Sequence, residues 1–116
     1  MSLRDEILEM DDLKREEITV PEWGKKRKVT IRELNGEERS QLYEICMVDG
    51  KFEASLMAPA LVTLSIIDPE TGEKVFTIED REKLWKKNGK VVHRISEKAM
   101  RLSGLGEKDQ EDAEKN

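Results

Sequence analysis

Residues 18–31 read ITVPEWGKKRKVTI and contain two short runs in which apolar and polar side chains alternate. The alternating β-branched residues are Ile18, Val20, Val29 and Ile31. Alternation with a period of two is typical of strands, and residues 23–26 supply a turn between the runs, so the sequence predicts a two-stranded hairpin. Pro21 cannot donate a ladder hydrogen bond, which places the first strand at a sheet edge or ends it there. Because an isolated hairpin is only marginally stable, we expect one face of it to pack on helices.

Two helices are predicted directly after the hairpin. Asn35 and Glu38 have the spacing of a capping box, and the apolar stripe of the helix that they open is Leu42, Ile45 and Cys46. Residues 48–51 end this helix, and a more hydrophobic one follows. Its core-facing positions are Met57, Ala60, Leu61, Leu64 and Ile67. We expect it at the centre of the fold, with Pro59 in its first turn or at a kink.

The second half of the chain predicts a turn and two more helices. Residues 68–72 (DPETG) form the turn, and Thr77 with Asp80 resembles a capping box for a short helix over residues 78–87. The last helix is amphipathic, and Gly104 is placed to close it, with Leu105 folding back. The apolar stripe of this last helix is Val92, Ile95, Ala99 and Leu102.

The two ends of the chain are acidic and differ in apolar content. Residues 3–13 predict a first, frayed helix that Ser2 caps, whereas residues 107–116 hold one alanine and no larger apolar side chain. The predicted fold is therefore α+β: a single small domain over residues 1–106, with an N-terminal β-hairpin packed on four to five α-helices. We expect residues 107–116 to form a flexible acidic tail.

Composition favours binding over catalysis. Of 116 residues, 41% are charged, against about 25% in a typical domain, and only 4% are aromatic, so the core is lean. A net charge of −5 argues against a nucleic-acid partner. The longest uncharged stretch, residues 54–67, is too short to cross a bilayer. A single cysteine and an acidic N-terminus without a signal-peptide pattern favour the cytoplasm.

No group of residues forms a catalytic, cofactor or metal signature. His93 lies one position off the stripe of the last helix and has no local nucleophile or orienting acid, so we interpret it as a surface or boundary residue. Cys46 shares the apolar face of its helix and is interpreted as a buried thiol. One cysteine and one histidine cannot build an ordinary zinc site, and the scattered glycines form no phosphate loop, so we expect no cofactor.

Charge is unevenly distributed. Residues 25–32 hold five bases and no acid, and residues 81–101 hold eight bases and two acids, while both ends are acidic. Such patches either steer a charged partner, let copies of the chain associate, or are simply a solvated surface. We expect self-association. A small regulator that uses the basic hairpin and Trp23 on nucleic acid is a rival interpretation.

The order of these segments as a whole resembles the tail assembly chaperones of long-tailed bacteriophages and prophages, from Ser2 to about Gly106. The segments that carry the resemblance are SLRDEIL (2–8), ITVPEWG (18–24), VTIREL (29–34), NGEER (35–39), LVTLS (61–65), the turn 68–72, Val75 and Phe76, and AMRLSGL (99–105). None is catalytic. The most specific are Val20 to Gly24 with the strand after it, and the closing Leu-Ser-Gly-Leu.

The resemblance implies a non-enzymatic role in phage tail assembly, acting in the cytoplasm of the bacterial host. Such proteins bind the tape measure protein and keep it soluble until tail tube subunits polymerise around it, and they are absent from the finished virion. The tape measure protein is thus the expected partner, and the tail tube protein a second candidate. The expected partner-binding residues are Trp23, Val92, Ile95, Ala99, Leu102 and Leu105, if part of the stripe is exposed; the opposing interpretation is that the stripe belongs to the core. The alternative function is a structural tail or head–tail connector component that stays in the virion.

Overall fold

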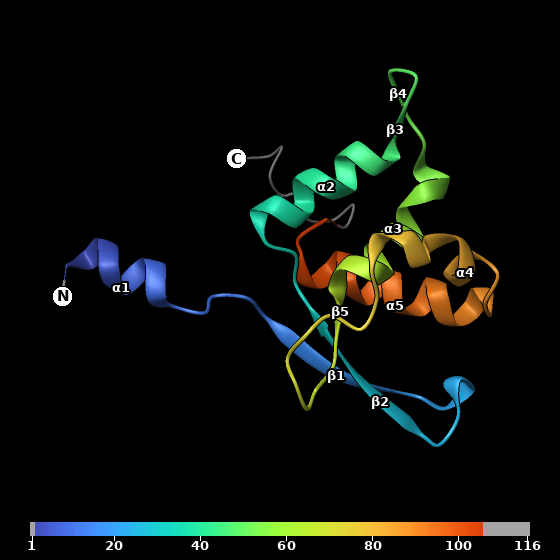
Figure 1. Cartoon of the computed structure of the whole chain (residues 1–116), viewed down its shortest axis with the longest axis horizontal. Helices are drawn as coiled ribbons and strands as arrows, with labels where there is room; N and C mark the ends of the chain where they lie inside the picture. The colour runs from blue at the N-terminus through green and yellow to red at the C-terminus, as the bar shows by residue number, and fades with distance from the viewer. Residues whose placement is uncertain (1, 106–116) are drawn as a thin grey trace.

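The predicted hairpin is present in the computed structural model, which describes residues 2–105 (Figure 1). Strands β1 (Arg15–Val20) and β2 (Arg27–Arg32) pair antiparallel, with Ile18 opposite Val29. Pro21 ends β1 and begins a 3-10 turn, η1 (Pro21–Trp23). β1 is an edge strand, because the sheet order is β1-β2-β5. Both consequences expected of the proline are therefore confirmed.

The third strand, β5 (Ile66–Ile67), was not predicted. We expected the central helix to run through Ile67, but α3 (Met57–Ser65) stops two residues earlier and Ile66 pairs with Ile31 of β2. The second edge of β2 would otherwise carry unpaired backbone groups, and two β-branched residues suit a strand that covers it. Helix α3 follows a 3-10 turn, η2 (Ala54–Leu56), with Pro59 in its first turn as expected.

Helix α2 (Gly36–Cys46) begins with the predicted capping box. The Glu38 N–H donates to Asn35 Oδ1 at 2.8 Å, and the Asn35 N–H donates to Glu38 Oε1 at 3.0 Å. The helix ends in a small hairpin of β3 (Met47–Val48) and β4 (Lys51–Phe52), where we expected only a helix end. Its turn residues Asp49 and Gly50 both have positive φ, 52° and 76°, as a type I′ turn requires.

The second half forms the two predicted helices. Thr77 and Asp80 open η3 (Ile78–Asp80) and α4 (Arg81–Trp85), and the Thr77 N–H donates to Asp80 Oδ2 at 2.9 Å. Helix α5 (Gly89–Leu102) follows and packs against α3. Gly104 takes a φ of 68° and the Leu105 N–H donates to the Met100 carbonyl at 2.8 Å, which is the expected closure.

The core lies between the sheet and helices α2, α3, α4 and α5. Every residue from Pro59 to Ile67 is buried, so α3 is central, as predicted. The largest fully buried side chains include Ile31, Leu61, Leu64, Ile66 and Ile95. Residues 2–105 thus form a small α+β domain in which four of five α-helices pack with a small antiparallel sheet, within the predicted number of four to five.

Helix α1 (Leu3–Glu9) lies away from this body (Figure 1). Ser2 caps it as expected, because its hydroxyl accepts from the Asp5 N–H at 3.2 Å, but the helix is shorter than the predicted span of residues 3–13. Asp11 pairs with Arg15 at 3.0 Å and accepts from the Leu13 N–H, which holds the chain in a non-helical conformation before β1. The expected tail of residues 107–116 lies outside the described residues.

Candidate protein-binding surface

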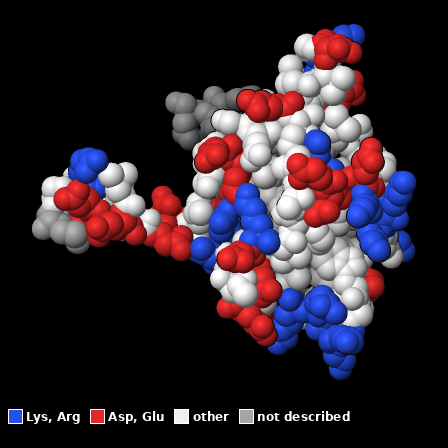
Figure 2. Space-filling view, viewed as in Figure 1, with Lys and Arg blue, Asp and Glu red and all other residues white. Residues whose placement is uncertain are grey.

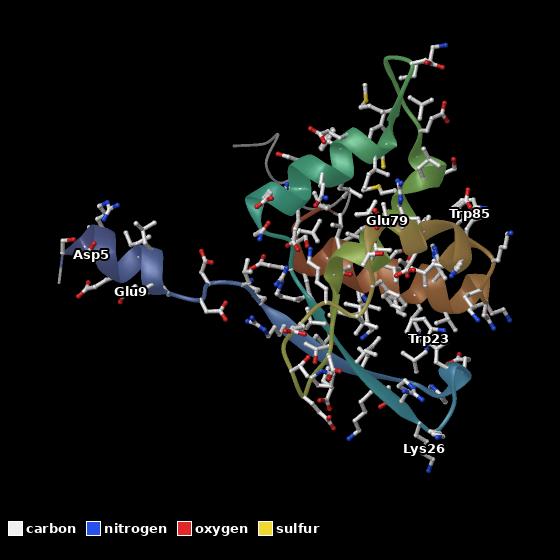
Figure 3. All side chains as sticks on the ribbon, viewed as in Figure 1. Asp5, Glu9, Trp23, Lys26, Glu79 and Trp85 are labelled. Carbon is white, nitrogen blue, oxygen red and sulfur yellow. The ribbon has the colours of Figure 1, made fainter. Side chains whose placement is uncertain are left out.

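An exposed apolar groove lies where α2, the β3–β4 hairpin, the start of α3 and the end of α5 meet. Its volume is about 420 Å³. The side chains that form its apolar wall are Tyr43, Met47, Phe52, Met57, Met100 and Leu105. We call these six residues the methionine groove. Figure 3 shows yellow sulfur atoms beside the β3–β4 hairpin and between α2 and the start of α3.

The small hairpin builds one wall of the methionine groove. Because the Asp49–Gly50 turn reverses the chain directly after α2, Phe52 returns beside Tyr43, with ring centroids 5.8 Å apart. The Glu53 N–H donates to the Cys46 carbonyl at 2.7 Å, which holds the open end of the hairpin against the end of α2. Local turn chemistry thus places two aromatic rings side by side on the surface.

The walls are exposed to a degree that is unusual for large apolar side chains. Tyr43 is 61% exposed, Phe52 47% and Met47 44%. Met57 and Met100 are half-buried and also line an adjoining hollow of about 510 Å³ between α3 and α5. Contiguous exposed apolar surface of this kind marks interaction sites. Methionine side chains are flexible and polarisable, and therefore suit a partner whose shape varies.

Arg39 contributes a positive charge to the rim of the methionine groove. Its Nη1 donates to the Ser103 carbonyl at 2.7 Å, and the Ser103 hydroxyl accepts from the Leu34 N–H at 2.9 Å. These bonds fix the end of α5 against α2 and the strand end, so the position of Leu105 in the wall is set. Arg101 adds a second positive charge at the rim of the adjoining hollow.

Comparison with known proteins identifies the family of this chain. A sequence model described as "phage tail assembly chaperone" matches residues 2–116. The chain belongs to the phage tail assembly chaperone family. Among solved structures, the tail assembly chaperone of bacteriophage HK97 is similar in fold, with a TM-score of 0.63 and 24% sequence identity. That match covers 88% of this chain and 95% of the HK97 chain. No curated protein matches the chain.

The structure places the residues that the sequence proposed for partner binding in three different environments. Within the last-helix stripe, Val92, Ile95 and Ala99 are buried in the core of this tail assembly chaperone. Leu102 and Leu105 are half-buried, and Leu105 lines the methionine groove. The exposed part of the stripe is thus its C-terminal end, and a partner-binding role for the stripe stays a prediction.

Trp23 does not belong to the methionine groove. It is the last residue of η1, is half-buried (labelled in Figure 3), and packs edge-on against Phe76. The ring centroids are 6.2 Å apart and the interplanar angle is 76°. Glu22, next to it, accepts from both terminal nitrogens of Arg94 on α5 at 3.1 Å. These contacts join the hairpin to α5. A partner-binding role for Trp23 also stays a prediction.

Sequence reasoning missed five of the six residues of the methionine groove, all except Leu105. The available signal was the segment MVDGKF (47–52), in which Asp-Gly stands between apolar residues, a pattern that is typical of a tight hairpin. We interpreted residues 48–51 only as the end of a helix. That the rings of Tyr43 and Phe52 remain uncovered depends on tertiary packing and has no sequence signal.

Cys46 and His93 lie in different environments. Burial raises the pKa of the Cys46 thiol, which is fully buried, whereas His93 is exposed and its Nε2 lies 3.2 Å from Glu97. Between residues 2 and 105, no group of histidine, cysteine, aspartate or glutamate side chains is arranged to hold a metal ion. No helix in the same part of the chain is both long and apolar enough to span a membrane.

Charge is segregated on the surface, as the sequence indicated. Figure 2 shows the bases of the β1–β2 turn gathered at one end of the molecule and acidic side chains along the α1 arm. Lys25 and Lys26 have positive φ values in that turn, and both are exposed. The methionine groove therefore lies on an otherwise strongly charged molecule.

Proposed function

We propose that this tail assembly chaperone acts without catalysis, by holding an apolar helical segment of the tape measure protein in the methionine groove. It would keep that protein soluble in the cytoplasm of the bacterial host until the tail tube polymerises around it. The observation that carries the proposal is the exposed groove of aromatic and methionine side chains.

The physical argument is that of a helix bound in a groove. An amphipathic helix buries apolar side chains at positions i, i+3 or i+4 and i+7, and a groove between helices accepts that spacing. A very long helical protein presents many such faces, and methionine walls can repack around different ones. The charged outer surface of the chaperone would keep the complex in solution.

The earlier candidate residues fit this proposal to different extents. Leu105 lies in the groove wall, and Leu102 is the half-buried last residue of α5. Val92, Ile95 and Ala99 would act indirectly, by packing α5 on α3 and so holding the groove in shape. Trp23 lies outside the groove, so its expected contact with the tape measure protein would be a separate one at the hairpin end.

Co-expression with the tape measure protein tests the proposal. Phe52→Asp places a charge in the groove wall and should lower the soluble fraction of the tape measure protein, and Leu105→Asp should do the same. Val75→Asp is the matched control, because Val75 is also 47% exposed but lies outside the groove. Equal solubility with the native chain, Phe52→Asp and Val75→Asp would contradict the proposal.

Mass spectrometry of purified phage particles tests when the protein acts. A chaperone that leaves before the tail is complete should be missing from the particles. Its presence at a fixed ratio to the tail tube protein would instead favour a structural tail or head–tail connector component.

A further inference from the structure

Helix α1 carries an apolar face that its own chain does not cover. Leu3 is 72% exposed and Leu8 67%, and no residue of the helix is buried. Leu3, Ile7 and Met10 are spaced at i, i+4 and i+7, which places them on one side of the helix. A helix of seven residues is not stable alone in water, so another surface is expected to cover this face.

The chain between α1 and β1 points the helix away from its own body. The Lys14 N–H donates to Glu33 Oε1 at 2.9 Å, and the Glu33 N–H donates to the Lys14 carbonyl at 2.8 Å. Lys14 thus lies opposite Glu33 and extends the pairing of β1 with β2 by one residue. Asp11 pairs with Arg15 and accepts from the Leu13 N–H, as described above. A return of α1 onto its own chain would have to break these contacts, whereas docking on another molecule would keep them.

The methionine groove offers α1 an apolar lining and a positive charge at its rim. A 420 Å³ hollow lined by methionine and aromatic side chains can accept the apolar face of a short helix. The arm is acidic, with Asp5, Glu6, Glu9, Asp11 and Asp12 against Arg4. The charged residue at the rim of the groove is Arg39, whereas the adjoining hollow is lined by both Arg101 and Glu97, so the positive charge that the arm would meet is mainly that of Arg39. Opposite charges at a rim favour encounter and orientation.

From these observations we propose that α1 of one copy docks in the methionine groove of a second copy. The contact joins two different surfaces, so it is heterologous. Each copy carries one α1 helix that can dock and one methionine groove that can receive the helix of another copy. The inference concerns this chain alone and does not depend on the partner in tail assembly. The expected self-association would then depend on this defined contact and not on general attraction between charged patches.

Sedimentation of the purified full chain tests the contact directly. Ile7→Asp puts a charge on the apolar face of α1 and should raise the dissociation constant for self-association at least about tenfold. Phe52→Asp should do so from the groove side, and Met47→Asp is a second groove variant in case the first disturbs the small hairpin. Val75→Asp should associate like the native chain. Strict monomers of the native chain at high concentration would overturn the proposal, and so would unchanged association of Ile7→Asp.

Mixing the two defective chains distinguishes exchange between copies from docking within one chain. Ile7→Asp retains an intact groove and Phe52→Asp retains an intact arm, so an equal mixture should form a one-to-one heterodimer although each chain alone is monomeric. If the mixture remains monomeric while circular dichroism shows both variants folded, the arm does not bind the groove of a second copy and the proposal fails.

Discussion

Glu38 places a buried carboxylate between two cations. It is 4% exposed, accepts from Arg32 Nη2 at 2.6 and 2.7 Å, and pairs with Lys74. Its second role is in the capping box of α2, where it accepts from the Asn35 N–H. One side chain thereby joins β2, the start of α2 and the loop after β5. Removal of the Glu38 charge leaves the largely buried Arg32 without its partner, whereas the more exposed Lys74 stays in contact with solvent.

We expect Glu38→Gln to lower the free energy of unfolding by about 3 kcal/mol at pH 7, since breaking a buried ion pair from one side costs that order. Chemical denaturation measures the change. Glu37→Gln, on the exposed side of the same helical turn, is the control and should change stability by less than about 0.5 kcal/mol. A similar loss for both variants would mean that burial of the Glu38 charge is not the cause.

The same carboxylate makes stability depend on pH in acid. Burial alone would raise the pKa of Glu38, but hydrogen bonds from Lys74 and from the Asn35 backbone, with the charge of Arg32, hold it below its usual value of 4.5. A group whose pKa is lowered by folding stabilises the protein above its unfolded pKa, and that contribution is lost as the pH falls through the folded pKa. The stability difference between native chain and Glu38→Gln should therefore shrink between pH 5 and about pH 3. A constant difference over this range would contradict the argument.

Among the elements, the β3–β4 hairpin is the one on which the methionine groove depends most directly. Gly50 has a φ of 76°, where a β-branched residue is strained, and no atom other than its neighbours lies within 4 Å of the space that a Cβ would occupy. Gly50→Val should therefore cost about 1–2 kcal/mol through backbone conformation alone. We expect the hairpin to open locally and solubilisation of the tape measure protein to weaken, with little change in the overall unfolding midpoint. Amide hydrogen exchange at residues 47–52 measures the opening, and unchanged protection there would contradict it.

Helix α5 has a core part and a groove part, and the two should respond differently to mutation. Ile95 is fully buried against α3, so Ile95→Ala should destabilise the fold by about 2–5 kcal/mol. Leu105→Ala, at the half-buried end, should cost less stability and act mainly on partner binding. Thermal unfolding and pull-down of the tape measure protein separate the two effects. If Ile95→Ala folds as well as the native chain and loses binding, the stripe itself is the binding surface.

The sequence predicted those elements whose stabilising contacts join residues close together in the chain. Asn35 with Glu38, and Thr77 with Asp80, opened helices because each cap is complete within four residues. The strand Ile66–Ile67 could not be predicted, because it forms only where the distant β2 leaves an edge free. Likewise the spacing of Val92, Ile95 and Ala99 fixed one common face, but only packing on α3 decided that this face is buried. The methionine groove needed four separated segments and was visible only after folding.

For the whole molecule, a single groove serves two proposed occupants, namely the α1 arm of another copy and a helix of the tape measure protein. Two ligands that need the same surface exclude each other by mass action, so each lowers the apparent affinity of the other. In the self-associated form the apolar groove would then stay covered until the tape measure protein binds. Both the arm and the tape measure helix would present apolar side chains at helical spacing, which makes exchange between them possible.

This competition predicts how self-association responds to the partner. Adding a soluble helical fragment of the tape measure protein should dissociate the self-associated chaperone, and deletion of residues 2–10 should tighten fragment binding, because the internal competitor is gone. At concentrations where the native chain is monomeric, the deletion should leave the unfolding midpoint unchanged, since α1 buries no side chain within its own chain. Calorimetric titration of full-length and shortened chains measures the affinities, and sedimentation follows the assembly. Equal affinities for both chains, with the fragment bound to intact assemblies, would show that arm and partner occupy different surfaces.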